Sequence, residues 1–269
     1  MVQARLGSSR LPGKILMPAA GRPLLECMLE RVAAARSLDE IVVATTRQPA
    51  DEVIVRHCDR LSVACVEGDE TDLIARHLLA ARAARADIVV KIPSDCPLID
   101  PAAIDEVVGF FRTQHPRYGF VSNLHPPTWP DGNDVEVMSL DVLEAAAREA
   151  RLPFQREHTT PFIWDHPERF SQRNVAWSSG RDLSATHRLT LDYAEDYLLI
   201  SQVYEALYQP QDPIFSVEEI VDYLDARPEV RDLNAKHRGS AWMQRHTNEL
   251  RTKKWRPGIV SRTQSLEDA

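Results

Sequence analysis

Three positively charged side chains stand close together near the start of the chain, in a segment rich in small residues. Arg5, Arg10 and Lys14 lie within ten residues, and this segment also holds two glycines, two serines and a proline. Glycine lets a backbone approach a ligand closely, and successive loop N–H groups can form a concave site for an anion. The segment therefore suits a polyphosphate, although a solvated basic terminus would carry the same residues.

The spacing of this loop differs from that of two familiar phosphate-binding motifs. In the Walker A motif the glycines stand closer together, and Ser or Thr follows the lysine. Here five residues separate Gly7 from Gly13, and Ile15 follows Lys14. The dinucleotide motif G-x-G-x-x-G is absent as well. The sequence thus disfavours an ATPase of the P-loop type.

Two aspartates follow short apolar segments later in the chain. Asp95 comes after the run 88–92, and Asp192 comes after residues 189–191. In open α/β sheets ligands bind beyond the carboxyl ends of the strands, and carboxylates are good ligands for hard cations. Two such carboxylates, together with nucleotide phosphates, would form a magnesium site. Asp95 alone could equally lie in a surface turn or cap a helix.

Alternating strands and helices are expected to position these groups. A strand ends before the opening loop, and the further predicted strands of the first half are 41–45, 61–66 and 87–92. The predicted helices are 22–32, 50–58, 71–85 and 100–111, with Thr71 as the cap of the third. This alternation predicts βαβ units, a mostly parallel sheet and helices on both of its faces.

The pattern changes in the second half of the chain. The predicted strands there are 118–123, 134–138 and 186–191. The predicted helices are 140–151, 154–164, a helix after Asp192 that runs through Leu207, and 216–224 with a capping box between Ser216 and Glu219. The two halves together predict a mixed sheet.

Composition and charge restrict the class of protein. A hydrophobic content of 43% and a charged content of 27% are typical of a soluble globular protein, and the net charge of −8 argues against nucleic acid as a partner. The four cysteines show no CxxC pairing, which favours free thiols in a reducing compartment. With no membrane span and no signal peptide in the sequence, we expect a cytoplasmic protein.

The end of the chain differs in charge from the rest. Residues 235–269 hold eight Lys or Arg and three acids, a net charge of +5 against −13 for the preceding residues. We expect a catalytic domain over 1–234 and a basic tail over 235–269, helical or partly disordered. Such a tail is usually solvated, and contact with a partner or a membrane is the alternative.

The loop and the segments around Asp95 and Asp192 carry a family resemblance. Residues 4–14, 94–100 and 192–196 resemble motifs of the cytidylyltransferases, a group that includes CMP-Kdo synthetases, acylneuraminate cytidylyltransferases and the spore-coat polysaccharide cytidylyltransferase-like proteins. The resemblance spans residues 2–234. It implies an α/β fold of the nucleotide-diphospho-sugar transferase (GT-A or Rossmann-like) type. Because relatives have more apolar residues before the loop, we expect the first strand to begin upstream of Met1.

The resemblance also implies roles for individual residues. It places Mg²⁺ on Asp95 and Asp192, and makes both of them catalytic together with Arg10 and Lys14. The implied nucleotide contacts are Ala4, Arg5, Gly7, Ser8, Lys14, Thr45, Ser94 and Asp95. The implied acceptor contacts are Asp131, Asp134, Arg156 and His158, for which a loop acid, a strand-edge acid and a packed helix histidine remain ordinary alternatives. Asn133 stands where the subgroup usually has an apolar residue, so we expect that edge of the pocket to differ.

The resemblance implies transfer of a cytidylyl group from CTP to a sugar, sugar acid or related phosphorylated acceptor, with release of pyrophosphate, for a surface polysaccharide or glycan. Two alternatives remain open at this point. One is a metal-dependent glycosyltransferase of the same fold, although the spacing of Asp131 and Asp134 is one residue too long for its D-x-D motif. The other is a non-enzymatic NTP-binding protein. From the relatives we also expect a homodimer.

Overall fold

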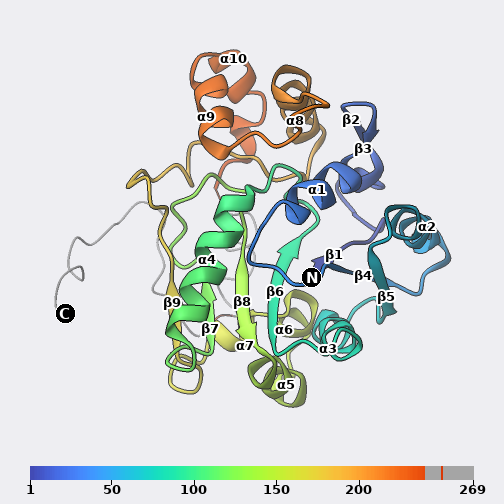
Figure 1. The fold of residues 1–269 in the computed structure, drawn as a ribbon, viewed down its shortest axis with the longest axis vertical. Coiled ribbons are helices and arrows are strands. Elements are labelled where there is room, and N and C mark those ends of the chain that lie inside the picture. Colours follow the sequence, from blue (N-terminus) through green and yellow to red (C-terminus); the bar gives the residue numbers. More distant parts are fainter. Residues whose placement is uncertain (240–249, 251–269) are drawn as a thin grey trace.

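The computed structural model of the chain describes residues 1–239 and residue 250, and most of the expected tail lies outside these described residues. Its centre is a seven-stranded sheet in the order β5-β4-β1-β6-β8-β7-β9 (Figure 1). The strands are β1 (Val2–Gln3), β4 (Val42–Thr46), β5 (Ala64–Gly68), β6 (Ile88–Pro93), β7 (Phe120–Ser122), β8 (Glu136–Ser139) and β9 (Gln172–Asn174). β2 (Pro18–Ala19) and β3 (Arg22–Pro23) form a separate hairpin.

The sheet is mixed, as the sequence predicts. β1 pairs in parallel with β4 and β6, and β4 pairs in parallel with β5. β8 runs antiparallel to both β6 and β7, while β9 is parallel to β7. The carboxyl ends of β1, β4, β5 and β6 therefore meet at one edge, where the opening loop and Asp95 follow their strands.

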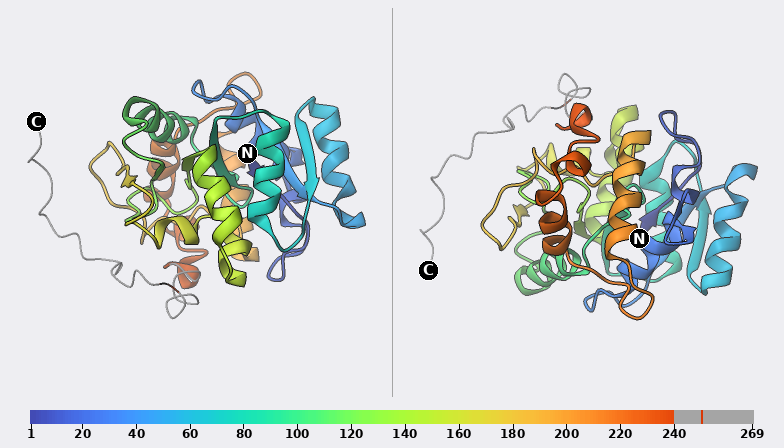
Figure 2. Two further views of the ribbon diagram at one scale, coloured as in Figure 1. Left: turned by 90° about the horizontal axis from the view of Figure 1, so that it is seen from below. Right: turned by 90° about the horizontal axis from the view of Figure 1, so that it is seen from above.

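Helices cover both faces of the sheet. The longer helices are α1 (Leu24–Ala33), α2 (Glu52–Leu61), α3 (Leu73–Ala83), α4 (Pro101–Gln114), α5 (Leu140–Glu149), α8 (Ala194–Leu207) and α9 (Val217–Asp225), and the shorter ones are α6 (Pro153–His158), α7 (Pro161–Trp164) and α10 (Pro228–Arg231). Along β6, Ile92 packs in one core cluster with Met28 of α1 and Val107 of α4. Val89 points to the other face, into the cluster that includes α3 and α5, which lie side by side in Figure 2.

The last helices form a third group. α8, α9 and α10 gather at the end of the molecule toward which β6 points (Figure 1), and α8 contacts both α9 and α10. Leu189 and Leu191 pack in the same cluster as Leu199 of α8 and Ile220 of α9. This cluster anchors the segment that leads into Asp192 over the carboxyl edge of the sheet.

Three sequence predictions about elements were wrong. Residues 186–191 form no strand, because only Arg188 makes a bridge, to Asp131. The single helix predicted over 154–164 is two helices, since Thr159 takes a φ of +69° between them. The third helix is capped by the side chain of Asp72 rather than Thr71. The capping box of α9 and the start of α4 after Asp100 are confirmed.

No helix in the described part of the chain is both long and apolar enough to cross a membrane.

Candidate active site

The opening loop closes on itself and is tied to the neighbouring strand. The carbonyl of Leu6 accepts hydrogen bonds from Ser8 N at 2.7 Å and from Gly13 N at 3.1 Å. Gly13 has a φ of +68°, a left-handed conformation in which glycine is favoured. The N–H of Leu6 donates to Oδ1 of Asp51 at 2.7 Å, and the other oxygen of this buried carboxylate bonds the hydroxyl of Thr46 in β4. Sequence reasoning missed this anchoring aspartate.

The two basic side chains at the end of the loop reach Asp192. Lys14, 8% exposed, begins a short 3-10 turn, and its Nζ lies 2.9 Å from Asp192 Oδ1. The same ammonium donates to the carbonyl of Leu191 at 2.5 Å. The guanidinium of Arg10 also pairs with Asp192 Oδ1. The fold thus brings together side chains that are 178 residues apart in sequence.

Asp95 joins this cluster through both backbone and side chain. Its carbonyl accepts hydrogen bonds from Leu191 N at 2.7 Å and from Thr190 Oγ1 at 3.1 Å. Its carboxylate Oδ2 lies 3.6 Å from Lys14 Nζ. All four residues that the sequence singles out as catalytic therefore meet at one place, with the two carboxylates facing one ammonium group.

The carboxylate of Asp192 lies in a strongly cationic setting. Burial by itself would raise its pKa, but Lys14, Arg10 and Arg188 outweigh burial and hold the pKa below its usual value. Asp192 is therefore ionised at neutral pH, which a cation ligand and an ion-pair partner both require.

The donor set of the two carboxylates fits magnesium. Among the described residues, no group of three or more His, Cys, Asp or Glu side chains is placed to hold a metal ion. Mg²⁺, however, is usually bound by one or two carboxylates plus substrate phosphates, and needs no cage built from protein alone. The Lys14 ammonium, within 3.6 Å of both Asp95 and Asp192, shows that one cation can face both carboxylates.

Arg188 links the two halves of the site, and sequence reasoning missed it. Its side chain is only 6% exposed, and Nη1 lies 3.0 Å from Asp131 Oδ2. Nη2 lies 3.5 Å from Asp192 Oδ2, and Nε lies 2.9 Å from Asp196 Oδ1. The available signal was a charged residue in the segment that the sequence predicts as a strand before Asp192. One buried guanidinium therefore connects Asp131, a predicted acceptor contact, to Asp192, a predicted metal ligand.

The backbone at Asp192 is held by Asp196. This carboxylate is fully buried, and its Oδ2 accepts hydrogen bonds from the N–H groups of Asp192 and Tyr193, each at 2.9 Å. Its Oδ1 accepts a hydrogen bond from Nδ2 of Asn234 at 2.9 Å. The turn that presents Asp192 thus has a defined geometry before any ligand binds.

Two of the four predicted acceptor residues lie next to the carboxylate cluster. Burial raises the pKa of Asp131 to about 6, against the opposing effect of Arg188, and raises the pKa of Asp134 to about 8. The negative charge of Asp95 adds to both shifts. These two side chains therefore share the electrostatic environment of the predicted metal ligand.

The other two acceptor residues, Arg156 and His158, lie on α6. The guanidinium of Arg156 binds Asp72, with Nε 2.7 Å from Oδ2, and Nη1 donates to the carbonyls of Ala147 at 3.2 Å and Ala150 at 3.0 Å. These bonds tie α6 to the start of α3 and the end of α5. His158 is the last residue of α6. A role for either in acceptor binding stays a prediction.

The loop that holds Asp131 and Asp134 packs closely against the segment before Asp192. At Gly132, which has a φ of +105°, an added Cβ would lie 2.6 Å from the backbone N of Thr190. Asn133, expected at the edge of the pocket, is instead buried: its Oδ1 accepts a hydrogen bond from Asp100 N at 2.9 Å, and its carbonyl accepts one from Asn123 Nδ2 at 2.6 Å. The amide completes backbone hydrogen bonds inside the core, and a difference at this edge of the pocket stays a prediction.

The remaining predicted nucleotide contacts line the same edge of the sheet. Ala4 N donates to Ala44 O at 3.1 Å, and Ser94 N donates to Gln3 O at 3.2 Å, so both follow directly on their strands. Thr45 is fully buried, and its hydroxyl has no hydrogen-bond partner in the described part of the chain. A role for Thr45 in nucleotide binding stays a prediction.

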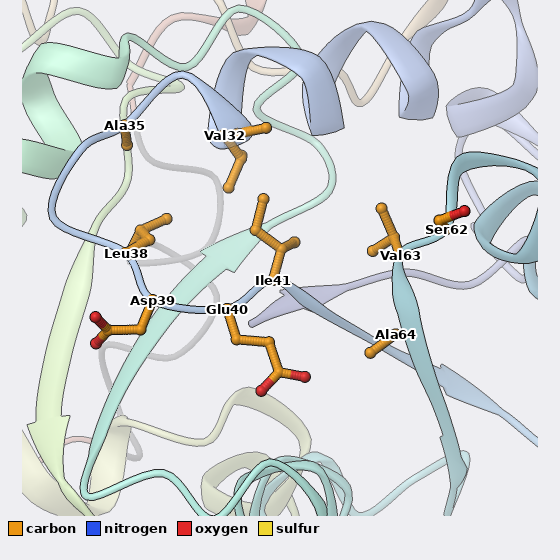
Figure 3. A pocket seen from close by; sticks show the side chains of 10 residues that line it. Val32, Ala35, Leu38, Asp39, Glu40, Ile41, Ser62, Val63 and Ala64 are labelled. Atoms are coloured by element: carbon orange, nitrogen blue, oxygen red, sulfur yellow. The ribbon is translucent and has the colours of Figure 1, made fainter.

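A cavity of about 420 Å³ lies away from this edge (Figure 3). Val32 of α1, Ile41 before β4 and Val63 before β5 point toward one another there, and Asp39 and Glu40 also line it. It sits at the amino ends of the strands, whereas the loop, Asp95 and Asp192 gather at the carboxyl ends. The cavity is therefore not part of the candidate site.

A comparison with known protein families decides the relationship. The family model of the cytidylyltransferases matches residues 1–220. The chain belongs to the cytidylyltransferase family. A cytidylyltransferase structure from Leptospira borgpetersenii is 32% identical, with a TM-score of 0.79, over 85% of this chain and 94% of its own. This result confirms the family and the fold that the loop and the aspartate motifs predict.

Two curated relatives of this cytidylyltransferase carry names that describe a role. The spore coat polysaccharide biosynthesis protein SpsF of Bacillus subtilis is 28% identical over 85% of this chain and 94% of its own. The 8-amino-3,8-dideoxy-manno-octulosonate cytidylyltransferase of Shewanella piezotolerans is 31% identical over 45% of this chain and 50% of its own.

Proposed function

We propose that this cytidylyltransferase transfers the cytidylyl group of CTP to a sugar, sugar acid or related phosphorylated acceptor, with release of pyrophosphate, in the synthesis of a surface polysaccharide or glycan. The observation that carries the proposal is the meeting of Arg10, Lys14, Asp95 and Asp192 at the carboxyl edge of the sheet. The names of the two curated relatives support the sugar-like acceptor and the polysaccharide.

The cationic groups of the loop would bind the phosphates. Asp192 pairs with both Lys14 and Arg10. Phosphate oxygens would compete for the same donors, and charge-assisted hydrogen bonds to anions are among the stronger ones in proteins. Lys14 and Arg10 would then hold the β- and γ-phosphates, which leave as pyrophosphate. Gly7 and Ser8 offer further donors in the loop.

The two carboxylates would hold a magnesium ion. When bound, Mg²⁺ supplies charge neutralisation at the α-phosphate and orients it. Asp95 and Asp192 are fixed relative to each other by the backbone bond between Leu191 N and Asp95 O. An acceptor oxygen would attack the α-phosphorus in line, forming one P–O bond while the bond to the β-phosphate oxygen breaks. The residues here mainly position and neutralise charge, which supplies most of the catalysis in such transfers.

The acceptor would approach from the side of Asp131 and Asp134. Arg188 holds Asp131 next to Asp192, so an acceptor hydroxyl bound by Asp131 would lie close to the nucleotide phosphates. Asp134, whose pKa is raised to about 8, can be protonated near neutral pH and can then donate a hydrogen bond to a carboxylate or phosphate of the acceptor.

A pyrophosphate-release assay tests the proposal. The purified chain is mixed with Mg²⁺, with each of the four NTPs, and with octulosonic acids, nonulosonic acids, aldose phosphates and small alcohol phosphates in turn. We expect release with CTP and one acceptor class only. Release with no NTP, together with consumption of a nucleotide sugar, would refute the proposal in favour of a glycosyltransferase.

A further inference from the structure

The segment after α10 reaches the candidate site from a part of the chain beyond the family match, which ends at residue 220. Residues 235–237 form a 3-10 turn, and Asn234 directly before it is fully buried. We propose that His237 in this turn is a positioning residue of the nucleotide site, acting through Tyr193 on Arg10. This inference rests on the proposed function.

Asn234 fixes the place of the turn. Its Nδ2 donates to the carbonyl of Arg188 and to Oδ1 of Asp196, both at 2.9 Å. Asp196 is itself fully buried and bonds the backbone of Asp192. The turn is therefore anchored to the same unit that presents the predicted metal ligand.

The His237 ring lies flat on the ring of Tyr193. The centroids are 3.8 Å apart, and the planes differ by only 2°. His237 Nε2 lies 3.2 Å from Oε2 of Glu195, which holds the imidazole from the other end. The guanidinium of Arg10 lies 5.4 Å from the centre of the Tyr193 ring, within the range of a cation–π contact. His237, Tyr193 and Arg10 thus form a row of consecutive contacts. The row ends at Asp192, the ion-pair partner of Arg10.

This row limits the freedom of Arg10 before a nucleotide binds. Arginine has many rotamers, and ordering them on binding lowers affinity. A ring fixed by His237 keeps the guanidinium near the position where it would meet the phosphates. Because Arg10 would contact the β- and γ-phosphates, the effect of His237 should appear with CTP and be small with CMP.

The test uses single substitutions in the full-length chain. His237→Ala removes the stack, and His237→Phe keeps a flat ring without the ring nitrogens. His115→Ala is the matched control, because His115 also stacks on an aromatic ring, that of Phe111, but is exposed at the end of α4. Calorimetry measures the dissociation constants of CTP and CMP, and thermal unfolding measures the stability of each variant.

We expect His237→Ala to weaken CTP at least about fivefold and CMP less than about twofold, and His237→Phe to stay within about twofold of the unchanged chain for both. His115→Ala should leave both affinities unchanged. In a chain already carrying Arg10→Ala, His237→Ala should have no further effect on CTP, since residues that act through one another are not additive.

The inference is overturned by equal weakening of CTP and CMP, by a His237→Phe variant as weak as His237→Ala, or by additive effects of the Arg10 and His237 substitutions. CTP binding by the chain without substitutions distinguishes a failure of this inference from a failure of the proposed function. If that chain binds no CTP, both fail. If it binds CTP and His237→Ala binds CTP equally well, only the role of His237 fails.

Discussion

The clearest test of the site is the substitution Lys14→Met, which keeps most of the apolar stem and removes the ammonium. That group donates to Leu191 O at 2.5 Å and lies 2.9 Å from Asp192 Oδ1. A hydrogen bond to a charged group contributes about 1.5–3 kcal/mol, and about 1.4 kcal/mol corresponds to a tenfold change in affinity. If Lys14 binds the β- or γ-phosphate, its loss should weaken CTP roughly 10- to 140-fold. CMP lacks these phosphates and should bind within about twofold.

Calorimetry with CTP and CMP measures the two affinities directly. The matched control is Lys91→Met, because Lys91 is also buried in an ion pair, with Glu136, but lies within β6. Both variants should lose stability, whereas only Lys14→Met should change the ratio of the CTP and CMP affinities. Equal weakening of the two nucleotides by Lys14→Met would refute the assignment of Lys14 to the triphosphate.

The other predictions concern the carboxylates and arginines around this lysine. Asp95→Asn and Asp192→Asn should each lower kcat at least about a hundredfold with near-normal circular dichroism, because each removes charge that stabilises the transition state; near-normal turnover in both would contradict the magnesium site. Arg188→Met leaves buried carboxylates uncompensated and should lower the free energy of unfolding by about 3–5 kcal/mol in urea titrations; an unchanged midpoint would show that the ion pairs contribute little. The pKa of Asp134 is raised to about 8 in the folded protein, so between the unfolded-state pKa and 8 the folded state holds a proton on Asp134 that the unfolded state has lost. The free energy of unfolding therefore falls as the pH rises through this range. Asp134→Asn should therefore gain stability over the unchanged chain as pH rises from 5 to 8, and parallel curves would contradict the shift. Arg156→Ala should raise the KM of the acceptor and leave CTP affinity within about twofold; the reverse pattern would place Arg156 on the nucleotide side.

Secondary structure was predictable where the pattern is local. The β-branched run at 41–45 and the apolar run at 87–92 became β4 and β6, each shifted by only one residue at the ends. The segment 186–191 was also predicted as a strand and forms none. Its backbone forms two hydrogen bonds with Asp131, at His187 O and Leu189 N, and one with Asp95, at Leu191 N. These bonds make one bridge, at Arg188, and no longer ladder develops. Local sequence does not reveal which backbone partner a segment will meet.

The helix predicted over 154–164 is broken at its middle. Pro161 lies inside this range, and a proline lacks the N–H that would continue a helix but suits the first turn of a new one. Thr159 takes a positive φ and Pro161 starts the second helix, so this break had a local signal that the prediction missed. Arg156, in the first of these helices, then bonds the carbonyls of Ala147 and Ala150 at the end of α5. Arg156 also binds Asp72 at the start of α3, and this contact, 84 residues away in the sequence, could not be predicted from the local pattern.

The sequence by itself determined the chemistry of the site: a loop with the cations for a polyphosphate, and Asp95 and Asp192 placed after apolar segments. These signals are local: each depends only on residues that are adjacent in the sequence, either within the loop or at the end of an apolar segment. Only the tertiary structure decided that Lys14 faces both carboxylates, that Arg188 joins Asp131 to Asp192, and that Asn133 points into the core. Such contacts join segments far apart in the chain. A charge or amide needs a protein partner only where the fold buries it away from water, and the sequence does not reveal which group that partner will be.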